Sequence, residues 1–289
     1  LETTKFKKMS KTKYQATENQ KTNAEKWFSK LRDKICKEFE DIENSESNRN
    51  SFKIKNWKRD GGGGGKMSIM KGNIFEKVGV NISTVYGKFS ENFRSNIPGA
   101  EDDGKFWASG ISVVSHPKNP FVPAAHMNTR LIVTSKTWFG GGGDITPMKP
   151  SKVMSREFHN DLKNSCNRHN ENYYDEFKKW ADEYFLIKHR NETRGDGGIF
   201  FDYINTGNWE KDFSFIRDIG ETFLNSYSSI VQKTKNSPWN EKDREDQLIK
   251  RGRYAEFNLI YDRGTLFGLK TGGNIDAILM SLPPEVKWP

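Results

Sequence analysis

Apolar residues recur at helical spacing near the start of the chain. Trp27, Phe28, Leu31, Ile35 and Phe39 share one side of a helix, which we predict over residues 23–42. We predict further helices over three later ranges: 151–166, 171–188 and 210–235. Neither a regular βαβ alternation nor an internal repeat accompanies these helices.

Other stretches follow the patterns of strands and turns. Residues 72–89, "GNIFEKVGVNISTVYGKF", alternate loosely, and residues 110–147 predict two strands joined by a proline-rich bend. "GGIFFDYIN" (197–205) is typical of a short buried strand, and residues 253–273 predict a hairpin. "AILMSLPP" (277–284) closes the chain as another apolar element. Together these patterns favour a single α+β domain, in which α-helices flank both faces of a large antiparallel sheet.

Two glycine runs interrupt these patterns, Gly61–Gly65 and the run 140–143 in "TSKTWFGGGGDITP". Glycine is costly to order, so we expect loops that move or that something approaches closely. A phosphate-binding loop does not fit, because Asp60 stands where its first glycine belongs and Met67 replaces its hydroxyl residue. The dinucleotide fingerprint fails as well, since Lys66 stands where its last glycine belongs.

The distribution of charge argues against a nucleic-acid partner. Of the net charge of +9, most lies in residues 1–66, which hold 17 Lys and Arg against 10 Asp and Glu. A nucleic-acid-binding protein usually carries its basic residues across a folded face. The polar, lysine-rich residues 1–22 instead predict a disordered arm, followed by a catalytic domain over 23–289.

Cysteine use and hydropathy bear on location. The two cysteines, Cys36 and Cys166, lie far apart without CxxC spacing, which suits a reducing cytoplasm. No stretch approaches the roughly 18–20 apolar residues of a membrane-spanning helix. We therefore expect a cytoplasmic protein without an integral membrane segment.

Alternation within the strands of 110–147 gathers polar side chains. His126, Asn128 and Arg130 share one face of the second strand, and Ser112 and His116 share a face of the first. If these faces match, the patch can bind anionic groups and move protons. The alternative is an ordinary solvated face of the sheet.

Two arginine-containing segments offer further candidates. Arg194 follows a basic helix end, where it either complements the helix dipole or clamps a carboxylate. In the expected hairpin, alternation aligns Arg253 and Arg263 at the ends of an apolar strip. That strip suits a large flat molecule with charged edges, or ordinary sheet packing. The five histidines lack close ligand spacing, so the sequence gives only a weak metal signal.

These segments together resemble the oxygen-dependent coproporphyrinogen III oxidase family. The matching stretches span residues 57–288 in the family's order. They are "WKRDGGGGGKMS", "IFEKVGVNIS", "SHPKNPFVPAAHMNTR", "WFGGGGDITP", "KKWADEYFLIKHRNETRGDGG", "RGRYAEFNLIYDRGT" and "ILMSLPP". The resemblance implies an oxidoreductase of haem biosynthesis that converts the propionates on rings A and B of coproporphyrinogen III to vinyl groups. It implies O2 as co-substrate, protoporphyrinogen IX, CO2 and H2O2 as products, no organic cofactor, and a homodimer.

The resemblance also implies roles for individual residues. His126 becomes the proton donor, and substrate binding falls on Ser112, Asn128, Thr129, Arg130 and the Gly272–Gly273 turn. A divalent metal has been proposed for the histidines that match His116, His126, His159 and His189, and a metal-free mechanism is argued as well. Asn274 stands where many relatives have arginine, Asp196 replaces a commonly apolar residue, and relatives often continue beyond Pro289.

Asp144 directly follows the second glycine run and offers a reason for those glycines. We expect its carboxylate, offered from a glycine loop, to accept the pyrrole N–H groups at the centre of the macrocycle. Arg130, Arg194 and Arg253 would hold the anionic rim of the macrocycle. The candidate catalytic residues are His126, Asp144 and Arg253. The alternative is that Asp144 caps the turn of "DITP". Two rival functions remain: a metal-dependent oxygenase and a porphyrin carrier without catalysis.

Overall fold

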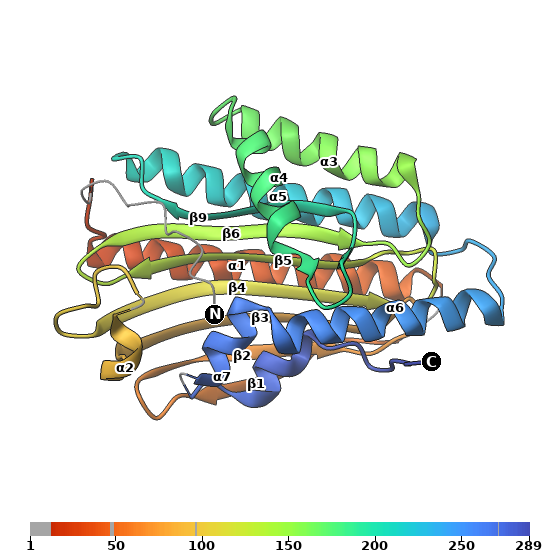
Figure 1. Cartoon of the computed structure of the whole chain (residues 1–289), viewed down its shortest axis with the longest axis horizontal. Helices are drawn as coiled ribbons and strands as arrows, with labels where there is room; N and C mark the ends of the chain where they lie inside the picture. Colours follow the sequence, from red (N-terminus) through yellow and green to blue (C-terminus); the bar gives the residue numbers. More distant parts are fainter. Residues whose placement is uncertain (1–12, 47–48, 96, 271) are drawn as a thin grey trace.

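Seven antiparallel strands form one sheet in the order β1-β2-β3-β4-β5-β6-β9. The computed structural model describes residues 13–46, 49–95, 97–270 and 272–289 (Figure 1). The strands of this sheet are β1 (Lys53–Lys58), β2 (Gly63–Met70), β3 (Phe75–Lys88), β4 (Lys105–Pro117), β5 (Ala124–Val133), β6 (Thr137–Thr146) and β9 (Gly197–Ile204). A small hairpin pairs β7 (Leu186–Ile187) with β8 (Glu192–Thr193). The expected antiparallel α+β fold is confirmed.

Helices cover both faces of this sheet. The first face packs against α1 (Glu18–Glu43), α3 (Lys152–Asn167) and α5 (Trp209–Thr234). The opposite face carries α6 (Glu241–Ile260), α7 (Arg263–Lys270), α8 (Ile275–Ile278) and a 3-10 turn, Leu279–Ser281 (Figure 1). At the β9 edge, α4 (Tyr173–Tyr184) contributes Phe177 to the main hydrophobic core and Ala181 to a smaller cluster with Phe200 and Phe257. Two short elements complete the chain: α2 (Glu91–Arg94) and the 3-10 turn Asn44–Glu46.

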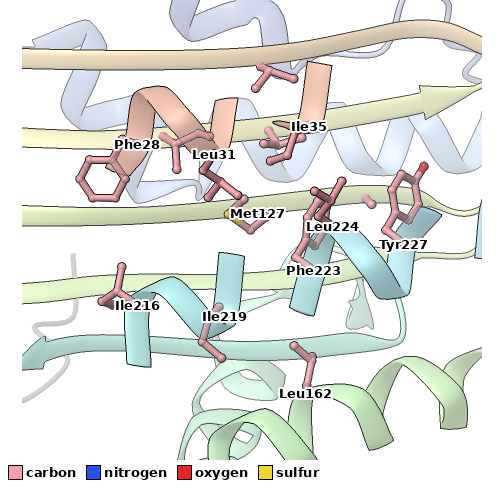
Figure 2. Close-up of a cluster of buried hydrophobic side chains, with 14 of the residues drawn as sticks. Phe28, Leu31, Ile35, Met127, Leu162, Ile216, Ile219, Phe223, Leu224 and Tyr227 are labelled. Carbon is pink, nitrogen blue, oxygen red and sulfur yellow. The ribbon is translucent and has the colours of Figure 1, made fainter. Parts of the chain in front are cut away.

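The main hydrophobic core lies between the sheet and the first layer of helices. Figure 2 shows Leu31 of α1 beside Met127 of β5; Phe28 of α1 and Phe223 of α5 belong to the same cluster. These side chains are almost completely buried. On β4, successive residues point to opposite faces, so Val113 enters this core while Val114 packs with Tyr254 and Met280 on the other side. One face of the sheet thus supplies most of the core and leaves the other for a site.

The helix expected over 23–42 is present and begins earlier, at Glu18. Thr17 and Gln20 form a capping box that fixes this start. The preceding residues are held on the sheet, because the Ala16 N–H donates to Thr137 Oγ1 at 3.0 Å and Tyr14 donates to Asp212 at 3.1 Å. The arm expected over 1–22 therefore does not extend to residue 22, and its residues 1–12 lie outside the described residues.

The hairpin expected over 253–273 is wrong. This segment forms the end of α6 and all of α7. The buried side chains of α6 include Arg251, Tyr254, Ala255 and Asn258, a helical spacing that the alternating interpretation overlooked. A capping box between Asn240 and Asp243 starts the helix. Arg253 and Arg263, which alternation aligned on one strip, therefore lie on different helices. The shorter apolar segment that follows forms α8 and the 3-10 turn.

Most of each glycine run lies in a strand rather than in a loop. Gly63–Gly65 belong to β2, after a turn in which Gly62 has φ of +114°. The run 140–143 lies in the middle of β6, where every residue is buried and paired with β5, and most pair with β9 as well. A Cβ atom at Gly142 would lie 2.4 Å from the Ile199 carbonyl oxygen. The close approach of neighbouring backbone explains why glycine occupies this strand.

Both cysteines are buried and free. Within the described ranges, no helix is long and apolar enough to cross a bilayer.

Gly142 and Gly143 offer a matched test of this packing. We expect Gly142→Ala to lower the free energy of unfolding by about 1–3 kcal/mol, the usual cost of overpacking. Gly143→Ala is the control, because its Cβ would meet Phe223 at an ordinary 3.5 Å; its stability should stay within about 1 kcal/mol of wild type. Denaturant unfolding of both variants measures the difference. Equal stabilities would contradict the close packing of β6 on β9.

Candidate active site

The register of three central strands brings the predicted polar residues together. Ser112 on β4 lies opposite Asn128 on β5, and His126 lies opposite both Val114 on β4 and Asp144 on β6. Their side chains therefore project from the face of the sheet that carries α6–α8. The expectation that the two strands match these faces is confirmed.

A continuous chain of side-chain contacts runs across this face. Arg194 pairs with Asp144 Oδ2. Asp144 Oδ1 lies 2.9 Å from His126 Nδ1, and His126 Nε2 lies 3.2 Å from Asn128 Nδ2. Arg130 continues the chain with 2.8 Å to Asn128 Oδ1 and 3.0 Å to Asp202 Oδ2. We call these six residues the polar chain.

Elementary hydrogen-bond chemistry fixes the direction of every bond in the polar chain. Arginine nitrogens only donate, so the Asn128 atom that faces Arg130 is its carbonyl oxygen. The amide nitrogen of Asn128 then donates to His126 Nε2. Because Nε2 accepts, the ring proton lies on Nδ1 and is donated to Asp144. Asn128 thereby keeps one imidazole nitrogen of His126 as an acceptor.

The Asp144–Arg194 pair is the buried end of the polar chain, with both side chains 2% exposed. Burial raises the pKa of the Asp144 carboxyl, but the Arg194 guanidinium and His126 lower it by more, so its pKa lies below the ordinary 3.8. The Arg194 guanidinium is surrounded by aromatic faces, with its Cζ 4.1 Å from the Phe185 ring centre and 4.7 Å from that of Tyr254. These contacts hold a charge pair that water does not reach.

The structure places Asp144 and Arg194 differently from the loop and rim positions expected of them. Asp144 lies in a strand, and its two oxygens are occupied by Arg194 and His126. It therefore does not cap a turn, and its contact with the centre of a macrocycle stays a prediction. Arg194 is likewise buried on Asp144, with a further contact of 3.3 Å to Asn258, and its contact with the rim of a ligand stays a prediction.

Three other predicted positions lie apart from the polar chain. Arg253, on α6, pairs with Glu192 and Glu256, each at 3.3 Å. Thr129 points into the core on the opposite face of the sheet, so only its backbone borders the site. Asn274 caps α8 by accepting from the Ala277 N–H at 2.9 Å, after the Gly272–Gly273 turn.

The four histidines proposed as metal ligands do not converge. His116 contacts the Ser281 carbonyl oxygen, and His159 contacts Tyr174 and the Asp196 carbonyl oxygen. His189 binds Glu256, while His126 belongs to the polar chain. Across the residues that the structure describes, no three His, Cys, Asp or Glu side chains form a group that could hold a metal. The histidine set thus does not fit a shared metal, which corrects that expectation.

Asp202 and Trp138 are site residues that the sequence analysis missed. Trp138 Nε1 donates to Asp202 Oδ1 at 3.1 Å, and Asp202 pairs with Arg130. The available signal was the aspartate in "GGIFFDYIN", an acidic residue near the end of a predicted buried strand. Such a carboxylate requires a partner, but the sequence does not identify Arg130, which lies two strands away.

Comparison with known proteins gives a consistent result. Residues 23–289 match the family model described as coproporphyrinogen III oxidase. The chain is 58% identical over 267 residues to a protein of Rickettsia bellii (strain OSU 85-389) named oxygen-dependent coproporphyrinogen-III oxidase, covering 91% of this chain and 96% of that protein. Proteins of the same name from Rickettsia rickettsii (strain Sheila Smith) and Rickettsia africae (strain ESF-5) are 58% and 57% identical over the same shares.

We expect Asp144→Asn to lower the free energy of unfolding by about 3–5 kcal/mol, because it leaves the buried Arg194 charge without its partner. Adding Arg194→Met removes that charge and should recover most of the loss. Denaturant unfolding of the single and double variants gives the coupling. Additive effects would show that the two side chains do not form a pair.

The same pair predicts the direction of a pH dependence. The folded-state pKa of Asp144 lies below 3.8, so its stabilising effect is complete above that pH and is lost as the pH falls through the folded-state value. The stability difference between wild type and the Asp144→Asn variant should therefore shrink in acid, because a protonated Asp144 leaves Arg194 without an anionic partner just as the asparagine does. A difference that grows in acid would contradict this sign.

Proposed function

The chain belongs to the coproporphyrinogen III oxidase family, and we propose that it oxidatively decarboxylates coproporphyrinogen III with O2. In each step, one propionate loses CO2 while two hydrogens pass to O2 as H2O2, which leaves a vinyl group. Two such steps, on rings A and B, give protoporphyrinogen IX in haem biosynthesis. The observation that carries this proposal is the polar chain on the face of the sheet that carries α6–α8, in a chain that is 58% identical to relatives of that name.

Arg130 is the cation of the polar chain best suited to a substrate carboxylate. Its side chain is 28% exposed, against 2% for Arg194. Asn128 and Ser112 are half-buried and lie on the same face of the sheet as Arg130, where they can contact a bound ligand. We therefore keep Ser112, Asn128 and Arg130 as substrate-binding residues, with Thr129 contributing through its backbone. The role of Arg253 at the substrate's rim and the substrate contacts of Gly272, Gly273 and Asn274 remain predictions.

His126 is suited to proton transfer on this face of the sheet. Its side chain is 19% exposed, and Asp144 orients its ring from beneath. As a donor, His126 first takes up a proton at Nε2, which requires Asn128 to give up its hydrogen bond. Asp144 would stabilise the resulting positive charge and hold the ring in place, which is a role for a buried carboxylate beside a histidine. An electron-rich pyrrole can itself react with O2, so the proposal requires no redox cofactor.

We also propose a homodimer. Four large apolar side chains near the end of α6 and on α7 and α8 are exposed: Leu259, Ile260, Leu269 and Ile275. A second copy of the chain could cover such a surface. The cytoplasmic location remains a prediction from the use of cysteine.

The deciding experiment for function is an aerobic assay of purified, metal-stripped protein with coproporphyrinogen III. We expect O2 uptake, CO2 release and a product that fluoresces as protoporphyrin after oxidation. Activity that disappears on chelation and returns with metal would favour the metal-dependent oxygenase. Tight binding without a divinyl product, with or without added metal, would favour the carrier.

For the assembly, we expect light scattering to give twice the chain mass of 33.4 kDa at micromolar concentration. Ile275→Glu, which places a charge on the exposed apolar surface, should shift the protein towards monomer because it buries a charge on association. A monomeric wild-type protein would refute the dimer. If the Ile275→Glu variant still forms the dimer, the interface lies on another surface.

A further inference from the structure

Arg130 is held by a carboxylate that is itself fixed from two sides. Asp202 Oδ2 lies 3.0 Å from Arg130 Nη2. Its other oxygen accepts from Trp138 Nε1 at 3.1 Å and from the Tyr203 N–H at 3.2 Å. The Asp202 side chain is 7% exposed. Both carboxylate oxygens are thus occupied, so Asp202 cannot turn away from Arg130 without losing these bonds.

The first glycine of the run in β6 provides the space for this pair. A Cβ atom at Gly140 would lie 2.3 Å from Asp202 Oδ1 and 2.8 Å from Arg130 Nη2. The ion pair therefore lies directly on the backbone of β6, and no larger residue fits beneath it. This requirement differs from that at Gly142, where the neighbouring backbone is the obstacle.

The backbone beside Asp202 is also unusual. Tyr203 has φ of +61°, in the left-handed region that non-glycine residues seldom adopt. The pairing of β6 with β9 shifts register at this point, between Phe139 and Gly141. A strained residue at a bulge persists only where its surroundings fix it, and such bulges commonly aim a side chain at a functional site.

We propose that Asp202 is a positioning residue that aims Arg130 at a carboxylate of the substrate. Arg130 has five N–H donors; Asn128 takes one through Nη1 and Asp202 takes one through Nη2. The Arg130 side chain is 28% exposed, so its remaining donors can meet a ligand on this face of the sheet, in a plane fixed before binding. A preorganised arginine loses less side-chain freedom when it binds. This inference rests on the proposed function only for the identity of the ligand.

The negative charge of Asp202 could also have the opposite effect on binding. Its negative charge also competes with any carboxylate that approaches Arg130, so neutralising it by Asp202→Asn would strengthen binding if competition dominated. If positioning dominates, the same change weakens binding. The direction of the change in affinity therefore separates the two effects.

The test measures binding of coproporphyrin III, the non-reacting oxidised form of the substrate, by its fluorescence. We expect Asp202→Asn and Gly140→Ala each to raise Kd up to about tenfold, the range for one side chain that must be ordered on binding. KM for coproporphyrinogen III should rise in parallel, with kcat within about twofold, because the reacting groups are untouched. Trp138→Phe, which removes one bond to Asp202, should give a smaller rise and serves if either variant fails to fold.

Two controls and one cycle separate positioning from a structural effect. Gly143→Ala lies on the opposite face of β6, and Asp218→Asn removes an exposed carboxylate that pairs with Arg168 and His169; neither should change Kd. In an Arg130→Ala background, Asp202→Asn should have almost no further effect, because Asp202 acts through Arg130.

Each other outcome is informative. Tighter or unchanged binding by a folded Asp202→Asn protein would overturn the proposal, as would an undiminished effect in the Arg130→Ala background. Wild-type protein that neither binds coproporphyrin III nor converts coproporphyrinogen III would instead refute the proposed function.

Discussion

The buried ion pair between Asp144 and Arg194 is the interaction on which the site depends. Removing two charges from water is costly, and the cost is offset only when both ions are well paired. Here Asp144 receives bonds from Arg194 and His126, and the guanidinium packs against the rings of Phe185 and Tyr254. The pair links β6 to the segment that follows β8 and to α6. The ring of His126 is therefore oriented by groups that already stabilise the fold.

The strength of the hydrophobic pattern decided how much of the fold the sequence predicted. The long amphipathic helices and the strands around the proline-rich bend were correctly predicted, because one side of each buries a continuous apolar stripe. The segment 253–273 fits both the alternation of a strand and the spacing of a helix. The buried side chains of α6, Arg251, Tyr254, Ala255 and Asn258, include polar residues that hydropathy does not count as buried. The glycine run was misassigned for a related reason. Glycine carries no pattern, so only the pairing of both neighbouring strands shows that it is a strand.

The site was predicted as far as strand alternation reaches. The alternation of side chains along a strand was enough to place five residues on one face: Ser112 and His116 of β4, and His126, Asn128 and Arg130 of β5. It did not reveal that His116 is buried against Ser281 and Tyr254, or that Asp144 lies beneath His126 rather than in a loop. The burial of His116 depends on what covers that end of the face, and the place of Asp144 depends on the pairing of β6 with β5. Asp202 required still more, because its partnership with Arg130 arises only when β9 joins the edge of the sheet beside β6.

The arrangement of charges explains why these residues lie together. Arg194 and Asp144 form one ion pair, Arg130 and Asp202 form the other, and His126 and Asn128 lie between them. The two pairs have no net charge, so the face can stay half-buried without an uncompensated ion. A bound carboxylate would alter this balance at Arg130, the more exposed end of the polar chain. Because Arg130 holds the Asn128 oxygen, and Asn128 holds His126 Nε2, the disturbance would reach the proton acceptor of His126 through only two hydrogen bonds.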